Sequence, residues 1–223
     1  NLYKTTEKYL DYVDFLAKSG LVVFKVDLRG HGESEGEPGG AYYSSDYVID
    51  VLNAYSALQK SGFVDPQKIG LWGHSMAGNV VFRAAVVKKE IPRVVIWAGA
   101  VYSYTDMAKY GIQDNSYRPA GMTVARQKRR QELFDTYGEF SETSDFWYQA
   151  VGLNFLEGVK TEFTVHHAVD DLVVNIGYSR DLIAELKKVG IGSDLFEYKT
   201  GGHNISGVSF GTAIKRSAEF LKN

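Results

Sequence analysis

Apolar runs and amphipathic segments alternate along most of this 223-residue chain. Short apolar runs bounded by turn residues predict buried strands, which we place at residues 21–28, 68–72, 93–97, 161–166 and 194–199. Apolar side chains at every third or fourth position predict helices, at residues 5–19, 46–60, 76–88, 176–189 and 208–221. Strands that alternate with helices predict an α/β fold, with a mostly parallel sheet covered by helices on both faces.

Residues 102–160 interrupt this alternation. They are richer in polar and aromatic residues, with helix-like pieces at 124–137 and 145–156. A run of four basic residues in this part is typical of a solvated helix face, with contact to an acidic substrate as the alternative; it comprises Arg126, Lys128, Arg129 and Arg130. We therefore expect one domain over residues 1–223, with residues 102–160 as an insertion within it.

Composition narrows the class of protein further. The net charge of -2 gives no reason to expect a nucleic acid or an anionic membrane as partner. The chain has no cysteine, which excludes disulfides, thiol catalysis and zinc–thiolate sites. No apolar run is long enough to span a bilayer and no signal peptide opens the sequence. The expectation is a cytoplasmic protein, with a homodimer as a possible assembly.

The strongest local signal surrounds Ser75. A short apolar strand is followed by the turn Gly73-His74-Ser75-Met76-Ala77-Gly78 and then by a helix. This is the layout of a nucleophile elbow, G-x-S-x-G, with alanine at the last glycine position. A serine that stands clear of a sheet sits on a sharp, strained turn, and its neighbours must be small because strand and helix pass close together. The alternative is a serine that only caps the helix.

Three further motifs occur in the order found in one superfamily. They are Asp27-Leu28-Arg29-Gly30-His31-Gly32-Glu33-Ser34, then His167-Ala168-Val169-Asp170-Asp171-Leu172-Val173-Val174, then Gly201-Gly202-His203-Asn204. In that order, the three motifs resemble the D-x-R-G-x-G-x-S turn, the acid loop and the histidine loop of the alpha/beta-hydrolase superfamily. The elbow is a fourth match, and the four together resemble the esterase and prolyl-oligopeptidase-like branch of that superfamily. Ala168 and Asn175 depart from the glycine and proline usual in the acid loop.

The resemblance implies a catalytic triad of Ser75, Asp171 and His203. Ser75 is the expected nucleophile, which needs a base to remove its proton. His203 is the expected base, because an imidazole titrates near neutrality. Of the five histidines, His203 alone follows the acid loop, as the order of the triad requires. Asp171 is the expected acid that orients the imidazole. Asp170 stays open as the alternative if the spacing is counted from His166, and the carboxylate that is not used is expected to cap the following helix.

The backbone N–H of Met76 is the expected first donor of the oxyanion hole, because it lies at the start of a helix. In the superfamily the second donor follows a central strand that precedes the first helix of this sequence. We therefore expect that this sequence is the later part of a longer polypeptide, whose N-terminal segment supplies that strand and the second donor. Without that segment, weak or no turnover is expected.

The other candidate residues have simpler interpretations. His74 is expected to pack in the elbow, His31 to hydrogen-bond locally, and His166 and His167 to end a strand without forming a metal pair. Gly30 and Gly32 lack the spacing of a dinucleotide site. The aromatic residues of the insertion either line an acyl pocket or form the insertion's own core; they are Tyr102, Tyr104, Tyr110, Phe146, Trp147 and Tyr148.

The resemblance predicts a serine hydrolase that cleaves a small carboxylic ester, aromatic esters included, through an acyl-enzyme, without a metal or organic cofactor. In the superfamily an insertion such as residues 102–160 lies over the site as a lid. Two alternatives stay open. One is a peptidase of the prolyl-oligopeptidase type, which has the same triad order. The other is a non-catalytic member of the fold that binds a ligand or a protein partner.

Overall fold

The computed structural model of the protein describes residues 9–38, 41–111, 128 and 131–223. Its centre is a sheet of four parallel strands in the order β1-β2-β3-β4, which comprise Leu71–His74, Arg93–Trp97, Glu162–Ala168 and Ser193–Tyr198. The register sets Gly73 beside Ile96, and Ile96 beside Val165. The prediction of a parallel α/β sheet is confirmed by this arrangement.

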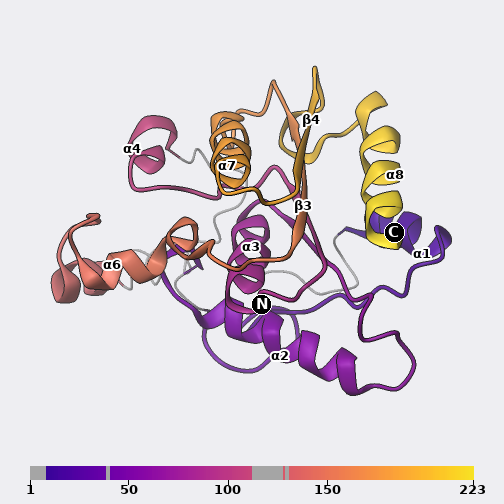
Figure 1. The fold of residues 1–223 in the computed structure, drawn as a ribbon, viewed down its shortest axis with the longest axis horizontal. Coiled ribbons are helices and arrows are strands. Elements are labelled where there is room, and N and C mark those ends of the chain that lie inside the picture. The colour runs from indigo at the N-terminus through magenta and orange to yellow at the C-terminus, as the bar shows by residue number, and fades with distance from the viewer. Residues whose placement is uncertain (1–8, 39–40, 112–127, 129–130) are drawn as a thin grey trace.

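Helices cover both faces of the sheet (Figure 1). On one face lie α2 (Asp46–Lys60), α3 (Met76–Val87) and α7 (Gly177–Lys188). On the other lie α1 (Leu10–Lys18) and α8 (Val208–Lys222). Because side chains alternate along a strand, Ile96 belongs to the core on the α3 side and Trp97 to the core on the α8 side. Every strand therefore contributes to two hydrophobic cores, which explains the continuous apolar runs in the sequence.

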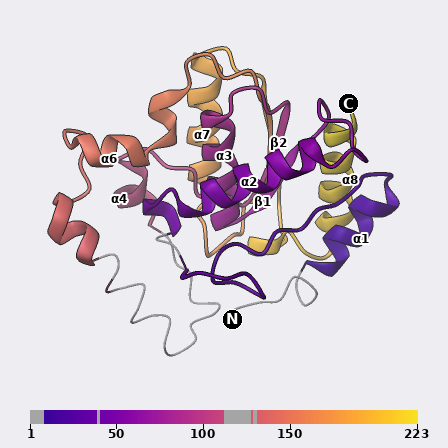
Figure 2. The same cartoon turned by 90° about the horizontal axis from the view of Figure 1, so that it is seen from below.

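The predicted insertion contains α4 (Asp106–Tyr110), α6 (Asp145–Ala150) and the short 3-10 helix η2 (Gly152–Phe155). Residues 128 and 131–137 are helical, in agreement with the predicted helix 124–137; residues 124–127 and 129–130 of that prediction lie outside the described residues. Figure 2 shows α4 and α6 at one end of the molecule, with α1 and α8 at the other. The described residues also include the 3-10 helices η1 (Ala41–Tyr43) and η3 (Gly202–Asn204).

Residues 21–28 correct one prediction. They do not form a strand. Leu21 and Val23 pack against the core on the α8 side, but Val22 and Phe24 are 66% and 53% exposed. A strand needs a partner for its backbone groups, and among the described strands β1 pairs only with β2. The prediction of a strand buried on both faces is therefore wrong for this structure.

Within the described part of the chain, none of the helices has the length and apolar character that crossing a bilayer requires.

Candidate active site

Ser75 lies between the end of β1 at His74 and the start of α3 at Met76. Its backbone has φ 57° and ψ -124°, a conformation that residues other than glycine rarely adopt. The turn is held by two backbone hydrogen bonds. The Ser75 N–H donates to the Trp97 carbonyl at 2.9 Å, and the Ser75 carbonyl accepts from the Gly78 N–H at 2.9 Å. The predicted sharp turn around this serine is thus present.

The neighbours of Ser75 must be small because the chain passes very close to itself on both sides of the serine. A Cβ atom added at Gly73 would lie 2.4 Å from the Ala77 carbonyl oxygen, and one at Gly78 would lie 2.9 Å from the Cα of Gly99. Real Cβ atoms do not approach other atoms so closely. The strand and the helix can cross at Ser75 only because Gly73 carries no side chain, and the helix can pass the end of β2 only because Gly78 carries none.

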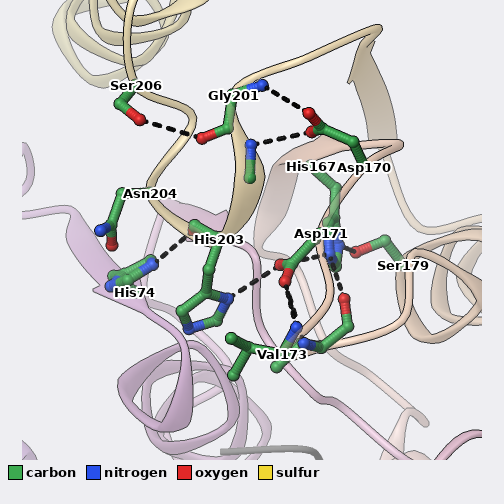
Figure 3. A network of polar contacts seen from close by, with 12 residues as sticks. His74, His167, Asp170, Asp171, Val173, Ser179, Gly201, His203, Asn204 and Ser206 are labelled. Atoms are coloured by element: carbon green, nitrogen blue, oxygen red, sulfur yellow. Dashed lines mark hydrogen bonds and ion pairs between the residues drawn. The ribbon is translucent and has the colours of Figure 1, made fainter. Parts of the chain in front are cut away.

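His203 lies in η3, just after β4, and its Nδ1 is 2.8 Å from Oδ2 of Asp171 (Figure 3). The carboxylate of Asp171 is buried, and its Oδ1 accepts hydrogen bonds from the N–H groups of Val173 at 2.8 Å and Val174 at 3.0 Å. Burial alone would raise the pKa of Asp171, but hydrogen bonds from His167, His203 and Val174 outweigh it and hold the pKa well below its usual range. An ionised Asp171 can hold the Nδ1–H tautomer of His203 and leave Nε2 free to accept a proton.

Asp170 has a different set of contacts. Its Oδ1 accepts from the Gly202 N–H at 2.8 Å and its Oδ2 from the Gly201 N–H at 3.3 Å. The helix that follows the acid loop is capped by another side chain, because the Gly177 N–H donates to Asn175 Oδ1 at 2.8 Å. The expectation that the second carboxylate caps this helix is therefore wrong; Asp170 binds the histidine loop instead.

The geometry brings His203 to the end of the strand that precedes Ser75. The ring of His74 lies 4.6 Å from the ring of His203, centroid to centroid, and its Nε2 is 2.9 Å from the His203 carbonyl oxygen. Among the described residues, no hydrogen bond joins Ser75 Oγ to the His203 ring. Such contacts are often long in an unliganded enzyme and shorten when substrate binds.

Met76 begins α3, so its N–H has no acceptor within the helix. The positive end of the helix dipole lies at the same place, beside the Ser75 hydroxyl. The predicted first oxyanion donor therefore has the required position in the chain, and its role stays a prediction. Groups of three or more His, Cys, Asp or Glu side chains that could hold a metal ion are not found in the described part of the chain.

His167 has a larger role than its position in a strand suggested. Its ring is fully buried, and its Nε2 lies 3.1 Å from Asp171 Oδ2 and 2.9 Å from the Val174 carbonyl oxygen. Its Nδ1 lies 2.7 Å from Ser179 Oγ. The carboxylate of Asp171 is therefore bound by two imidazoles, those of His167 and His203. The signal in the sequence for this contact is the four-residue spacing from His167 to Asp171.

The other histidines follow their predicted local roles. His74 is buried in the elbow, and burial together with the charge of His203 lowers its pKa to about 4. His31 Nδ1 lies 3.0 Å from the Arg29 carbonyl oxygen. His166 is buried between Tyr198 and Ser217, and burial lowers its pKa to about 3.

The three pocket candidates surround one phenylalanine. The rings of Tyr102, Tyr104 and Trp147 lie 5.8, 5.2 and 5.5 Å from that of Phe140. Tyr102 and Trp147 are fully buried, and their polar atoms donate to backbone carbonyls, whereas Tyr104 is partly exposed. These residues form a small aromatic core, and their contact with substrate stays a prediction. Of the predicted basic run, Arg126, Arg129 and Arg130 lie outside the described residues.

Comparisons with known proteins agree with this geometry. Residues 2–126, more than half of the chain, match the family described as serine aminopeptidase, S33. A polyketide transferase, claH, from Penicillium crustosum is 32% identical over 123 residues, which cover 55% of this chain and 39% of that protein. The chain thus spans well under two thirds of that relative's length.

Two solved structures have the same fold. A monoacylglycerol lipase from Paleococcus ferrophilus aligns over 99% of this chain and 91% of its own, with a TM-score of 0.64 and 19% identity. The esterase Pf2001 from Pyrococcus furiosus aligns over 98% of this chain and 78% of its own, with a TM-score of 0.68 and 21% identity. With the elbow, the acid loop and the histidine loop in order along a parallel sheet, the chain belongs to the serine aminopeptidase S33 family of the alpha/beta-hydrolase superfamily.

Proposed function

We propose that the protein hydrolyses carboxylic esters through an acyl-enzyme, with Ser75 as nucleophile, His203 as base and Asp171 as the acid that orients it. The observation that carries the proposal is the 2.8 Å hydrogen bond between His203 and the buried Asp171, with the His203 ring 4.6 Å from the ring of His74, the residue before a serine in a strained turn. A buried, ionised carboxylate bonded to an imidazole is the arrangement that makes the imidazole a base for a nearby hydroxyl.

The reaction follows from these positions. Ser75 Oγ attacks the ester carbonyl while His203 Nε2 takes its proton, and Asp171 stabilises the imidazolium that forms. The N–H of Met76 donates to the oxyanion; loss of one such donor costs roughly 3–4 kcal/mol of transition-state stabilisation. His203 then gives its proton to the leaving alcohol. In the second half it activates a water, which cleaves the acyl–Ser75 bond and regenerates the enzyme.

The second oxyanion donor is assigned by this proposal to a further strand of the same polypeptide. Among the described strands, none pairs with the outer edge of β1, and Val23 of residues 21–28 packs against the core that contains Trp72 of β1. A strand between them would satisfy both sets of backbone groups. The intact mass of the protein from its natural source tests this: a mass equal to residues 1–223 alone contradicts it.

The insertion is proposed to cover the site as a lid, with Tyr102, Tyr104 and Trp147 shaping the acyl pocket. Its support is that Tyr102 packs in the same cluster as Val174, the residue whose N–H binds Asp171. The insertion and the acid loop are therefore in contact. A partly exposed aromatic side chain such as Tyr104 suits an aromatic or short acyl group.

A peptidase is the second candidate, because the matching family is described as a serine aminopeptidase. The same triad could attack an amide, but an amine is a poorer leaving group than an alcohol and depends more strongly on protonation by His203. We rank it below the esterase, since the structural relatives above include an esterase and a lipase by name.

Turnover of a panel of nitrophenyl esters of graded acyl length, compared with aminoacyl-anilides, tests the proposal. We expect ester turnover that Ser75→Ala abolishes, and labelling of Ser75 by a fluorophosphonate. Asp171→Asn should lower kcat by about 10⁴-fold, as the loss of this acid does in serine proteases. Faster turnover of the anilides would favour the peptidase, and the absence of labelling in folded protein would favour a non-catalytic binding protein.

A further inference from the structure

The histidine loop, residues 201–206, needs support from outside itself. Its own backbone bonds close a tight turn: the Ser206 N–H donates to the Gly201 carbonyl at 2.9 Å, and the Ile205 N–H to the Gly202 carbonyl at 3.1 Å. Gly201 has φ 139°, which only glycine tolerates, and a Cβ there would lie 2.8 Å from Ile205 Cα. These bonds fix the shape of the turn but not its position relative to Ser75.

Asp170 binds the entry to this loop. Both of its carboxylate oxygens accept from backbone N–H groups, at 2.8 Å from Gly202 and 3.3 Å from Gly201 (Figure 3). Hydrogen bonds to an ionised acceptor are about twice as strong as neutral ones. The acid loop therefore holds the main chain of the two residues that precede His203.

His74 binds the next residue. Its Nε2 lies 2.9 Å from the His203 carbonyl oxygen, which can only accept, so Nε2 carries the proton. Because the buried ring is neutral, its Nδ1 accepts, and the Tyr9 hydroxyl 2.7 Å away is the donor. The residue before the nucleophile is thus bonded directly to the main chain of the base.

Tyr12 binds the residue after the base. Its hydroxyl donates to the Asn204 carbonyl at 2.9 Å, across 192 positions of sequence. Burial, with the charge of Asp11 in support, raises the pKa of Tyr12 to about 12, so the hydroxyl stays protonated and available as a donor. The ring packs edge-on against Trp97 of β2 and Phe210 of α8.

We propose that Asp170, His74 and Tyr12 are positioning residues that together clamp the backbone of the histidine loop beside Ser75. Each residue from Gly201 to Asn204 has a backbone group bound by a side chain from the acid loop, β1 or α1. Asp171 holds the imidazole ring while Asp170 holds the main chain that carries it. The inference rests on the proposed function, since it assigns these residues a purpose only if His203 is the base.

The clamp matters because proton transfer is sensitive to distance. A displacement of 1 Å in a catalytic group can cost about 100-fold in rate. His203 is carried by a turn containing two glycines with positive φ, so without outside contacts the ring would sample a range of positions. Loss of one contact should therefore lower the rate of the chemical step more than the affinity for substrate.

The test compares Asp170→Ala and Tyr12→Phe with a matched control, Asp65→Ala. Asp65 Oδ1 accepts from the Gln67 N–H at 2.9 Å in an exposed loop before β1, the same kind of bond far from the site. We expect Asp170→Ala to lower kcat about tenfold and Tyr12→Phe about threefold, with KM within about twofold of the wild type. These losses are smaller than the roughly 100-fold loss that a 1 Å displacement can cause, because each variant removes only part of the clamp. Asp65→Ala should leave both constants unchanged.

Asp170→Asn tests whether the hydrogen bond or the negative charge of Asp170 holds the loop, because asparagine keeps one oxygen acceptor and carries no charge. We expect it to restore most of the kcat that Asp170→Ala loses; a loss as large as that of alanine would overturn the proposal. Equal kcat values in Asp170→Ala and Asp65→Ala would also overturn the proposal, even if both variants melt at a lower temperature than the wild type.

Hydrogen exchange of the loop amides gives a readout that does not need turnover. We expect exchange at residues 201–204 to become faster in Asp170→Ala and to stay unchanged in Asp65→Ala. If the wild-type protein hydrolyses no ester, the proposed function fails, while the exchange measurement still decides the clamp. Unchanged exchange in Asp170→Ala means that the carboxylate does not hold the loop.

Discussion

Asp170 and Asp171 are neighbours in the chain, but their carboxylates bind different parts of the same loop. The Asp171 N–H turns back to the Ala168 carbonyl at 3.2 Å, at the end of β3. This turn points the Asp171 side chain into the protein, where it is buried, and leaves Asp170 exposed. Burial with four donors suits Asp171 to stabilise a charged imidazole, while an exposed carboxylate suits backbone amides at the surface.

His167→Leu tests the second imidazole on Asp171. It removes a buried donor from Asp171 and leaves the Ser179 hydroxyl without its 2.7 Å partner. We expect the free energy of unfolding at pH 7 to fall by about 2 kcal/mol, the usual cost of an unsatisfied buried polar group. The pKa of Asp171 should rise because a hydrogen bond that lowers it is lost.

The sign of the pH effect follows from linkage. A depressed carboxyl pKa stabilises the fold above the unfolded value of about 3.9, and that stabilisation is lost as the pH falls through the folded pKa. His167→Leu should therefore have its largest deficit at neutral pH and a smaller one at acid pH. Urea unfolding at several pH values measures it, with His31→Leu as control, since His31 is partly exposed and bonded locally. Equal deficits in the two variants would contradict the role of His167.

At the scale of the elements, the elbow depends on the close crossing of β1 and α3. Residues before and after Ser75 approach each other through backbone atoms, so the serine is lifted above the ends of the strands. The strain in the Ser75 backbone persists because the strand on one side and the helix on the other are both fixed by packing. Ala77 fits at the last glycine position of the motif because the crowding falls on Gly73 and Gly78 instead.

Gly73→Ala should disrupt this crossing. The new methyl group would lie 2.4 Å from the Ala77 carbonyl oxygen and 2.8 Å from Val81 Cγ2. We expect the free energy of unfolding to fall by about 2–3 kcal/mol, as for overpacking in a rigid core, and fluorophosphonate labelling of Ser75 to slow. Gly211→Ala is the matched control: it lies in α8 with open space around its Cα and should stabilise the helix by up to about 1 kcal/mol. A Gly73→Ala protein as stable and reactive as wild type would show that the crossing tolerates a side chain.

At the scale of the whole molecule, segments far apart in the sequence meet at one end of the sheet. The first described helix reaches the last loop through Tyr12 and Asn204, and β1 reaches it through His74. His74 is buried where β1 meets this loop, and His166 is buried between β3, β4 and α8; their pKa values are lowered to about 4 and 3. The folded protein therefore holds both rings neutral at pH values where the unfolded chain would protonate them.

Stability should consequently fall on mild acidification. Both histidines have folded pKa values below the ordinary 6.5, so they contribute stability above about pH 6.5 that is lost progressively as the pH falls toward 4. Each should add roughly 1.4 kcal/mol per pH unit to the slope of unfolding free energy between about pH 6 and 5. Urea titrations of wild type and His166→Asn at several pH values measure this. In the variant, the slope of unfolding free energy against pH should be smaller by the contribution of one histidine. Identical slopes would mean that His166 is not held neutral by the fold.

Features that depend on neighbours in the chain could be predicted from the amino-acid sequence. The elbow around Ser75, the order of strands and helices, and the spacing from His167 to Asp171 are local patterns, because turn sterics and the alternation of apolar residues act over a few positions. The predicted strands that precede Ser75 and follow the insertion are present in the sheet.

Contacts between groups that are far apart in the chain could not be predicted in this way, because they depend on how the whole chain packs. An apolar, beta-branched run such as residues 21–28 predicts a strand, but a strand exists only where a second backbone pairs with it. In the same way, no local pattern could show that Asp170 binds Gly202 or that Tyr12 binds Asn204, contacts that join residues 32 and 192 positions apart. These bonds form because packing of α1, β3 and β4 brings the groups together, and that packing is a property of the whole chain.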